Sequence, residues 1–407
     1  MRAIILRFHR YVGLALAAIL ILMGASGALL AFYDDIDGFL NAGMYVVPPG
    51  PRAEPLPPLL LRKRLEEQIP GVHAHNVPLS FHPGRAAVFP VTSTEGTPLE
   101  NDEYFVNPYT GAILGQRKRG DLSQGLANLM PFIPKFHASL ILGKTGKTIL
   151  GIAALLWVFD CLFGLYLTFP PRREPPRRTS EQWLTHWAGA WLVRGGSFVR
   201  TAFTTHRAIG LWIWIMLLVF AVSATHMRLP SVYNPLVARA LGGMGDIYAQ
   251  LTPVHVPEDQ RLSWDQALAA AEGRMAELAA QRGFTVEEPQ AFVYQDFNGL
   301  FYYRVRSTLD FAQGNTALWI HPRTGELVHF APPGGEAAGD TLTAWLVALH
   351  FGSIWGRPHQ VFVSLCGLLV IVLSVTGAIL WWRKYRPLGQ IRLVAQELCA
   401  RIDETEK

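Results

Sequence analysis

Four histidines occur in two matched pairs, each at the edge of a long apolar segment. His9 opens H-R-Y-V-G-L and His206 opens H-R-A-I-G-L, while His137 begins H-A-S-L-I-L-G-K and His350 begins H-F-G-S-I-W-G-R. A neutral imidazole is the commonest nitrogen ligand for metals, and histidine is costly at bilayer depth. A single such histidine is usually only interfacial, but four at matched positions favour metal or haem ligation.

The spacing of glycines indicates that the chain is two copies of one unit. Gly164 follows Gly143 by 21 residues, and Gly377 follows Gly356 by 21 residues. Internal repeats of this kind determine the architecture of a chain, and parallel repeats in membranes are related by an axis along the membrane normal. We therefore expect an internal two-fold repeat.

The composition is that of a membrane protein. Half of the 407 residues are hydrophobic and 16% are charged, against about a quarter charged in an average soluble chain. Four apolar segments are long enough to cross a bilayer core of about 30 Å. They are Val12–Phe32, Thr148–Phe169, Ala208–Thr225 and Val361–Trp382.

Arginines and lysines predict the orientation. They gather before the first span, between the second and third spans, and after the fourth span, so these three segments belong on the cytoplasmic side. This bias accounts for most of the net charge of +5, and no basic face indicates nucleic-acid binding. The expected order is residues 1–33, N-terminus and first span; 34–147, first outer domain; 148–169, second span; 170–205, basic linker; 206–226, third span; 227–358, second outer domain; 359–383, fourth span; 384–407, cytoplasmic tail.

Both outer segments contain the pattern of a β-hairpin. E-Y-F-V-N-P-Y-T-G-A-I-L and A-L-W-I-H-P-R-T-G-E-L-V share P-x-T-G, which is typical of a tight turn between strands. Ser263–Arg282 predicts a helix capped by Ser263, and Leu59–Ile69 predicts a weaker equivalent. We expect an α+β domain in each half, with most strand aromatics buried in a core. These aromatics are Tyr104, Phe105, Tyr294, Phe301, Tyr302, Tyr303 and Trp319.

Two b-type haems follow from pairing the histidines by topology. His9 pairs with His206 at the cytoplasmic ends, and His137 with His350 at the outer ends. The absence of C-x-x-C-H excludes ordinary covalent haem attachment. His226 breaks the symmetry and is an alternate outer ligand, and His359 is a weaker one. Asp160, inside the second span, is either part of a proton path or bonded to a buried polar group.

These pieces together resemble the PepSY-associated transmembrane family. The resemblance rests on the H-R-x-x-G-L starts, the histidine segments with G-[KR] and the P-x-T-G hairpins, and it covers nearly the whole chain. It implies four spans in a bacterial inner membrane and two periplasmic PepSY-type domains. The siderophore reductase branch, exemplified by ferrioxamine reductase, would make the chain a di-haem b oxidoreductase that passes electrons to a periplasmic ferric-siderophore. His9, His206, His137 and His350 match its ligand positions.

The electron donor must be a separate molecule. No G-x-G-x-x-G stands between a strand and a helix, so no dinucleotide domain is present. A cytoplasmic flavoprotein or a membrane quinol would supply the electrons.

Three other functions compete with this interpretation. The chain could be a haem subunit for another periplasmic acceptor, or a regulatory envelope protein that binds a peptidase and needs no haem. Metal transport is disfavoured, because the spans hold one mid-membrane acid and no broken helix pair is expected.

Overall fold

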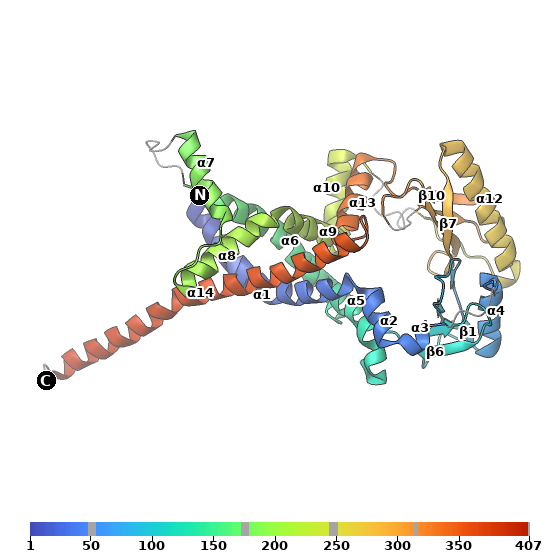
Figure 1. The fold of residues 1–407 in the computed structure, drawn as a ribbon, viewed down its shortest axis with the longest axis horizontal. Coiled ribbons are helices and arrows are strands. Elements are labelled where there is room, and N and C mark those ends of the chain that lie inside the picture. The colour runs from blue at the N-terminus through green and yellow to red at the C-terminus, as the bar shows by residue number, and fades with distance from the viewer. Residues whose placement is uncertain (48–53, 172–178, 244–250, 313–315, 406–407) are drawn as a thin grey trace. The chain divides into compact units, whose positions relative to one another are not determined.

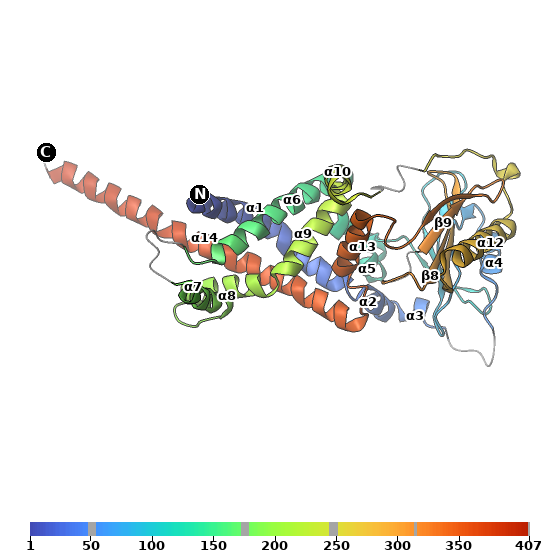
Figure 2. The same ribbon diagram turned by 90° about the horizontal axis from the view of Figure 1, so that it is seen from above.

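The computed structural model describes residues 1–47, 54–171, 179–243, 251–312 and 316–405. The chain forms two compact units (Figures 1 and 2). The helical unit comprises residues 1–29, 137–229 and 361–407, and the strand-bearing unit comprises residues 30–136 and 230–360. Each unit therefore draws on both halves of the sequence.

Long apolar helices make up the helical unit. Among the described residues, three helices can cross a membrane, and a bent pair provides a fourth crossing if it counts as one span. These helices are α1 (Arg2–Leu30), α6 (Gly143–Thr168), the bent pair α8 (Phe198–Trp212) and α9 (Trp214–Arg228), and α14 (Arg357–Thr405). The prediction of a multi-span membrane protein is confirmed to this extent.

The third predicted span is not straight. Helices α8 and α9 meet at Ile213 with a bend of 68°. The indole Nε1 of Trp214 donates a hydrogen bond of 2.9 Å to the backbone carbonyl of Cys161 on α6, which anchors the start of α9. The expectation that no helix pair would be broken is therefore wrong. The break could not be foreseen, because neither glycine nor proline marks it at Ile213.

The segment between α6 and α8 forms a short helix beside the end of α6. Helix α7 (Ser180–Ala188) continues into η3 (Gly189–Trp191). Trp183 and Trp187 lie against Phe169, with ring centroids 5.6 and 5.1 Å from it. Most of the predicted basic stretch of the linker, residues 172–178, lies outside the described residues.

Helices α1 and α14 approach each other closely at two glycines. A Cβ atom on Gly24 would lie 2.6 Å from the carbonyl oxygen of Gly367, and the hydroxyl of Ser364 donates to the carbonyl of Ala28 at 3.2 Å. Small residues allow such backbone approach between membrane helices. The crossing fixes α1 against α14.

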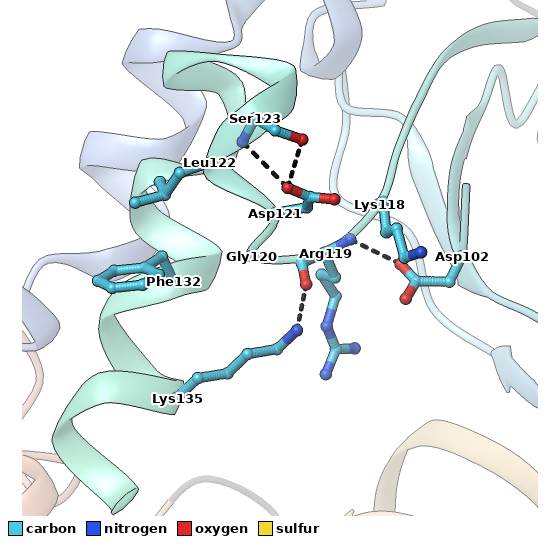
Figure 3. Close-up of a pocket in the computed structure, with 9 residues that line it drawn as sticks. All are labelled: Asp102, Lys118, Arg119, Gly120, Asp121, Leu122, Ser123, Phe132 and Lys135. Atoms are coloured by element: carbon cyan, nitrogen blue, oxygen red, sulfur yellow. Dashed lines mark hydrogen bonds between the residues drawn. The ribbon is translucent and has the colours of Figure 1, made fainter. Parts of the chain in front are cut away.

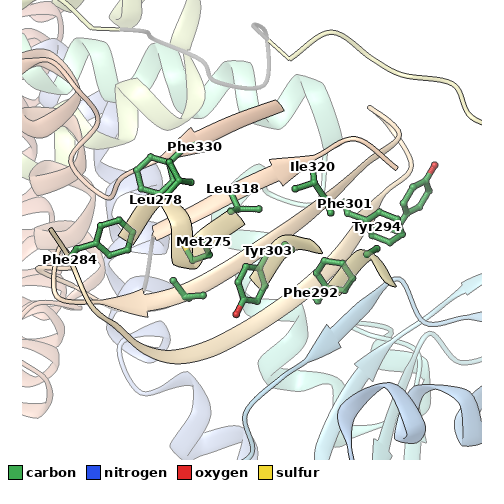
Figure 4. Packing of buried hydrophobic residues seen from close by; sticks show 13 residues of the cluster. Met275, Leu278, Phe284, Phe292, Tyr294, Phe301, Tyr303, Leu318, Ile320 and Phe330 are labelled. Atoms are coloured by element: carbon green, nitrogen blue, oxygen red, sulfur yellow. The ribbon is translucent and has the colours of Figure 1, made fainter. Parts of the chain in front are cut away.

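The strand-bearing unit is built on a five-stranded antiparallel sheet with the strand order β10-β9-β8-β7-β2. Helix α12 (Trp264–Arg282) packs on this sheet, and Met275, Phe292 and Phe301 are almost completely buried in the core between them (Figure 4). Ser263 caps α12 as predicted. The strands are β2 (Asn76–Pro78), β7 (Val286–Gln295), β8 (Leu300–Ser307), β9 (Thr316–Ile320) and β10 (Leu327–Ala331).

A second core lies under α4 (Pro58–Gln68), around Leu61, Leu65 and Phe89. The nearby small sheets are β3-β5-β6 and β1-β4. Their strands are β1 (Val72–His73), β3 (Ala87–Pro90), β4 (Thr92–Ser93), β5 (Glu103–Val106) and β6 (Ile113–Arg117). Six of the seven strand aromatics named from the sequence are buried, and Tyr302 is half-buried, so they belong mainly to the cores as expected.

The two predicted hairpins have the same turn. Gly111 and Gly325 adopt φ of +77° and +69°, and each donates its backbone N–H to the carbonyl four residues earlier, on Asn107 or His321. The side chains of Asn107 and His321 also accept backbone N–H groups of their turns. The P-x-T-G prediction is confirmed in both places.

Strand β2 joins the two outer segments, because it pairs with β7 through Val77 and Phe292. One sheet therefore contains strands from residues 34–147 and from residues 227–358, and the predicted division into two outer domains stays a prediction. The remaining elements are α2 (Tyr33–Leu40), α3 (Ala42–Tyr45), η1 (Leu122–Gln124), η2 (Leu126–Asn128), α5 (Leu129–Ser139), α10 (Pro230–Leu241), η4 (Glu258–Gln260) and α13 (Ala338–Phe351).

A buried ion cluster ties α2 to the small sheet. Arg117 donates to both carboxylate oxygens of Asp37 at 2.9 and 2.8 Å, and to Glu103 at 2.6 Å. The hydroxyl of Tyr45 donates to Asp37 at 2.6 Å. Burial and the Asp37 carboxylate raise the pKa of Tyr45 well above its ordinary value. Several hydrogen bonds within the protein therefore compensate these buried charges.

Candidate functional site

His9 on α1 lies against α6, where two residues on one helical face contact its ring. Its Nδ1 is 2.9 Å from a carboxylate oxygen of Asp160. A Cβ on Gly164, one turn further along α6, would lie 3.3 Å from Cε1 of His9. Residues four apart on a helix share a face, so the carboxylate and the bare glycine backbone together position the imidazole.

His206 on α8 has an equivalent environment on α14. Its Nδ1 is 3.0 Å from the carbonyl oxygen of Leu373 and 3.1 Å from the hydroxyl of Thr376. A Cβ on Gly377 would lie 3.2 Å from Cε1 of His206. Leu373 precedes Gly377 by four residues, as Asp160 precedes Gly164, so the acceptor and the glycine have the same spacing in both cases.

The structure brings His9 and His206 together. Their ring centroids are 6.2 Å apart and the rings are inclined by 62°. They come from helices almost 200 positions apart in the sequence, and the matched H-R-x-x-G-L segments predicted that they would meet. Their role as ligands stays a prediction.

His137, on the last turn of α5, lies against the other end of α1. Its Nδ1 is 2.8 Å from the hydroxyl of Ser26, and a Cβ on Gly27 would lie 3.4 Å from its Cε1. Burial, and next the positive charge of Arg228, lower the pKa of His137 to about 4. The imidazole is therefore neutral at pH 7, which is the form that binds a metal.

The acceptors around these three histidines define which ring nitrogen carries the proton. A carboxylate faces His9 and a backbone carbonyl faces His206, so each Nδ1 must donate. The Ser26 hydroxyl gives its own hydrogen to the carbonyl of Leu22 at 2.7 Å, so it accepts from His137. No described residue hydrogen-bonds to Nε2 of His9, His137 or His206, which leaves that lone pair for a ligand.

The turn after His137 is strained. Leu140 and Ile141 adopt φ of +52° and +61°, a region that costs non-glycine residues of order 1–3 kcal/mol each. Gly143 then begins α6 with φ of +57°. Such strain persists only where the surrounding structure holds the backbone in place. Here the strained residues form the turn between α5 and α6, three residues after His137.

The two histidine positions lie at opposite ends of the apolar part of α1. His9 and Ser26, the partner of His137, are 17 residues apart on one continuous helix. At 1.5 Å per residue this separation is about 25 Å. It approaches the thickness of the bilayer hydrocarbon core, about 30 Å.

The other predicted ligands are distributed between the two units. His226 lies on the last turn of α9 in the helical unit, and His350 on the last turn of α13 in the strand-bearing unit. The pairing of His137 with His350, or with His226, stays a prediction. His359 is only 2% exposed, and among the described residues its Nε2 has no hydrogen-bond partner. An unpartnered buried imidazole nitrogen keeps His359 as a candidate ligand.

A cation follows each candidate ligand histidine in its motif, and these cations are Arg10, Lys144, Arg207 and Arg357. Arg357 already has a partner. It binds both carboxylate oxygens of Asp35, one at 2.5 Å, and this bond lowers the pKa of Asp35. Arg207 donates to the carbonyl of Gly189 at 3.2 Å, while its buried Nε has no partner among the described residues. Arg207 is therefore better suited than Arg357 to bind an added anionic group.

A shallow basic cavity of about 380 Å³ lies in the strand-bearing unit. Lys118, Arg119 and Lys135 line it together with Phe132 (Figure 3). Asp102 and Asp121 line it too, and each accepts backbone N–H groups of the surrounding loop. No sequence motif marks this cavity, because most of its residues come from the loop after β6, from η1 and from α5.

A haem fits the residues around His9, His206 and His137. Each imidazole has a hydrogen-bond partner at Nδ1, a glycine next to its Cε1 and a free Nε2. Groups that bond to the second nitrogen in this way orient the histidine ligands of haems and metals. The described residues contain no group of three or more His, Cys, Asp or Glu that could hold a bare metal ion.

The fold and the site define a multi-span membrane protein with paired, oriented histidines between its apolar helices. The chain belongs to the PepSY-associated TM region family, whose sequence profile matches residues 6–384. Comparison with curated protein sequences gave no match.

Proposed function

We propose that the protein is a di-haem b reductase of the bacterial inner membrane, which moves electrons from the cytoplasmic side to a ferric-siderophore in the periplasm. The observation that carries this proposal is the common state of His9, His206 and His137. Each is held at Nδ1, packed on a glycine and left with a free Nε2. Inert interfacial histidines would not need the same three features.

We assign one haem to each end of α1. His9 and His206 would hold the first, and their rings already face each other at 6.2 Å. His137 would hold the second, together with His350, or with His226 as the alternate ligand. Bound haem would supply one-electron chemistry at the iron. The separation of about 25 Å along α1 corresponds to a relay across the bilayer.

The chain's own groups keep the relay dry and the ligands neutral. Ser26 and the Leu373 carbonyl accept the Nδ1 protons of His137 and His206, which fixes the tautomer that leaves each Nε2 lone pair for the iron. Buried side chains such as Ala208 and Leu150 line the helices nearby and exclude water. Reduction of the substrate iron would release it, because hard oxygen ligands of the hydroxamate type prefer ferric over ferrous iron.

A matched spacing of serines in the two halves supports this arrangement. Ser223 follows His206 by 17 residues, as Ser26 follows His9 by 17. Both serines are buried and donate to the carbonyl four residues earlier. We infer that the two halves are copies, with Ser223 at the position in the second half that Ser26 has in the first. Electrons would come from a cytoplasmic flavoprotein or a membrane quinol.

The first experiment is a visible spectrum of the purified protein in mild detergent, oxidised and dithionite-reduced, with a pyridine haemochrome assay. We expect sharp reduced α and β bands and about two b-haems per chain. The reduced sample should be reoxidised by ferric-siderophore. A colourless protein after expression with a haem precursor would contradict the proposal and favour a regulatory envelope protein.

Haem reoxidised by another periplasmic acceptor but not by ferric-siderophore would favour an electron-transfer subunit. The bend between α8 and α9 removes one argument against metal transport. The absence of a three-ligand metal group among the described side chains still weighs against it.

A further inference from the structure

Asp160 is a buried carboxylate inside the apolar helix α6, eight residues before its end. It is 8% exposed, and its Oδ1 accepts the Nδ1 proton of His9 at 2.9 Å. A Cβ on Gly13 would lie 3.7 Å from its other oxygen, so α1 leaves room for the carboxylate. An ionisable residue at this depth is costly, and such residues are retained for a function. Its contact with a ligand histidine indicates which function.

The three oriented histidines have acceptors of different charge. His9 faces a carboxylate, whereas His206 faces a carbonyl and a hydroxyl, and His137 faces the hydroxyl of Ser26. Asp160 precedes Gly164 by four residues, as Leu373 precedes Gly377. The acceptor for the Nδ1 proton is therefore a carboxylate at His9 and a backbone carbonyl at His206. The difference lies at one end of α1 only.

We infer that Asp160 gives the haem held by His9 and His206 a lower reduction potential than the haem held by His137. This inference rests on the proposed function. A carboxylate that accepts the Nδ1 proton draws it away from the ring, so Nε2 becomes a stronger donor. A stronger axial donor and a nearby negative charge both stabilise ferric over ferrous iron. The serine opposite His137 has neither effect to the same degree.

The consequence is a direction for electron flow. A reduced flavin or quinol would be oxidised at the His9 end, where it would release its protons and give up its two electrons one at a time. With the lower potential at that end, each electron would pass downhill to the end where His137 would hold haem. There each electron would reduce one Fe(III) of the chelate to Fe(II). Asp160 thus favours electron transfer from the His9 end to the His137 end over transfer in the reverse direction.

The experiment is a spectroscopic redox titration of the full-length, haem-loaded protein and its Asp160→Asn variant. The wild type should give two resolved midpoints. In Asp160→Asn the lower midpoint should rise and the higher one should stay, with an altered low-spin EPR signal for one haem only. Thr376→Val is the matched control, because it removes a neutral acceptor from His206 while the Leu373 carbonyl remains. Its shift should be smaller.

The outcomes separate the two proposals. A wild type without haem would overturn the proposed function itself. Two bound haems with unchanged midpoints in Asp160→Asn, or a shift of the higher midpoint, would overturn only the role of Asp160. If Asp160→Asn loses a haem, Asp160→Glu decides, because it keeps the charge. If Asp160→Glu retains both haems and the low midpoint, the inference is supported. If Asp160→Glu loses as much haem as Asp160→Asn, the inference is contradicted.

Discussion

Gly24 on α1 and Gly367 on α14 contact each other reciprocally through their backbones. A Cβ on Gly24 would lie 2.6 Å from the carbonyl oxygen of Gly367, and a Cβ on Gly367 would lie 2.7 Å from the carbonyl oxygen of Gly24. In both cases the nearest atom belongs to the backbone, so no flexible side chain can move aside to make room. The crossing therefore admits no larger residue at either position.

Substitution of either glycine should separate the two helices. We expect Gly24→Ala or Gly367→Ala to lower stability by about 1–3 kcal/mol through overpacking. Thermal unfolding in detergent, followed by circular dichroism, measures the effect. Gly210→Ala is the control, since a Cβ there meets only Leu373 at an ordinary 3.8 Å. Equal melting temperatures for all variants would contradict the close crossing.

Removal of one ligand histidine should remove one haem. His9→Ala or His206→Ala should lower the haemochrome count from about two to about one per chain, and so should His137→Ala. His186→Ala tests a histidine of the exposed face of α7 and should leave the count unchanged. A full complement of haem in His9→Ala would assign ligation elsewhere.

Loss of the Ser26 hydroxyl should weaken haem binding at the His137 end without abolishing it. Ser26→Ala removes the acceptor of the His137 Nδ1 proton, and second-shell changes of this kind cost about 10–100-fold in affinity. Haem retention during dilution or transfer to apomyoglobin measures the loss. Ser364→Ala, which removes only a bond to the Ala28 carbonyl, is the matched serine control. Identical retention by the two variants would mean that Ser26 does not orient the ligand.

Breaking the buried ion cluster should destabilise the strand-bearing unit. Arg117→Met leaves Asp37 and Glu103 buried without their cation, and a broken buried pair costs about 3–5 kcal/mol. Thermal unfolding should show a large decrease for Arg117→Met and a partial one for Arg117→Lys, which keeps the charge but not the forked geometry. Restored stability in Arg117→Met combined with Asp37→Asn and Glu103→Gln would assign the loss to unpaired charge.

The sequence predicted those features that rest on local chemistry. The capped helix after Ser263 and the two P-x-T-G turns follow from residue preferences at fixed positions, and the structure confirms them. The apolar segments also predicted the membrane helices. The meeting of His9 and His206 was expected because a repeat places equivalent residues around a common axis.

Features that depend on packing between distant segments could not be predicted. The break at Ile213 has no glycine or proline to mark it, and the pairing of β2 with β7 joins strands over 200 positions apart. The contact of Asp160 with His9 depends on how α1 faces α6, so the sequence left the role of Asp160 open. Ser26 had a signal, its recurrence as Ser223 after the repeated histidine, but serine is too common in helices for this to stand out.

Because one uninterrupted helix carries both His9 and Ser26, α1 also sets their angular phase. Each residue turns the helix by about 100°, so a single insertion between them would direct His9 away from α6 while Ser26 still faced His137. Seven inserted residues, about two turns, would nearly restore the phase but lengthen the spacing by about 10 Å. Homologous chains should therefore vary freely in the loops beside α1 and keep the number of residues between these two positions fixed.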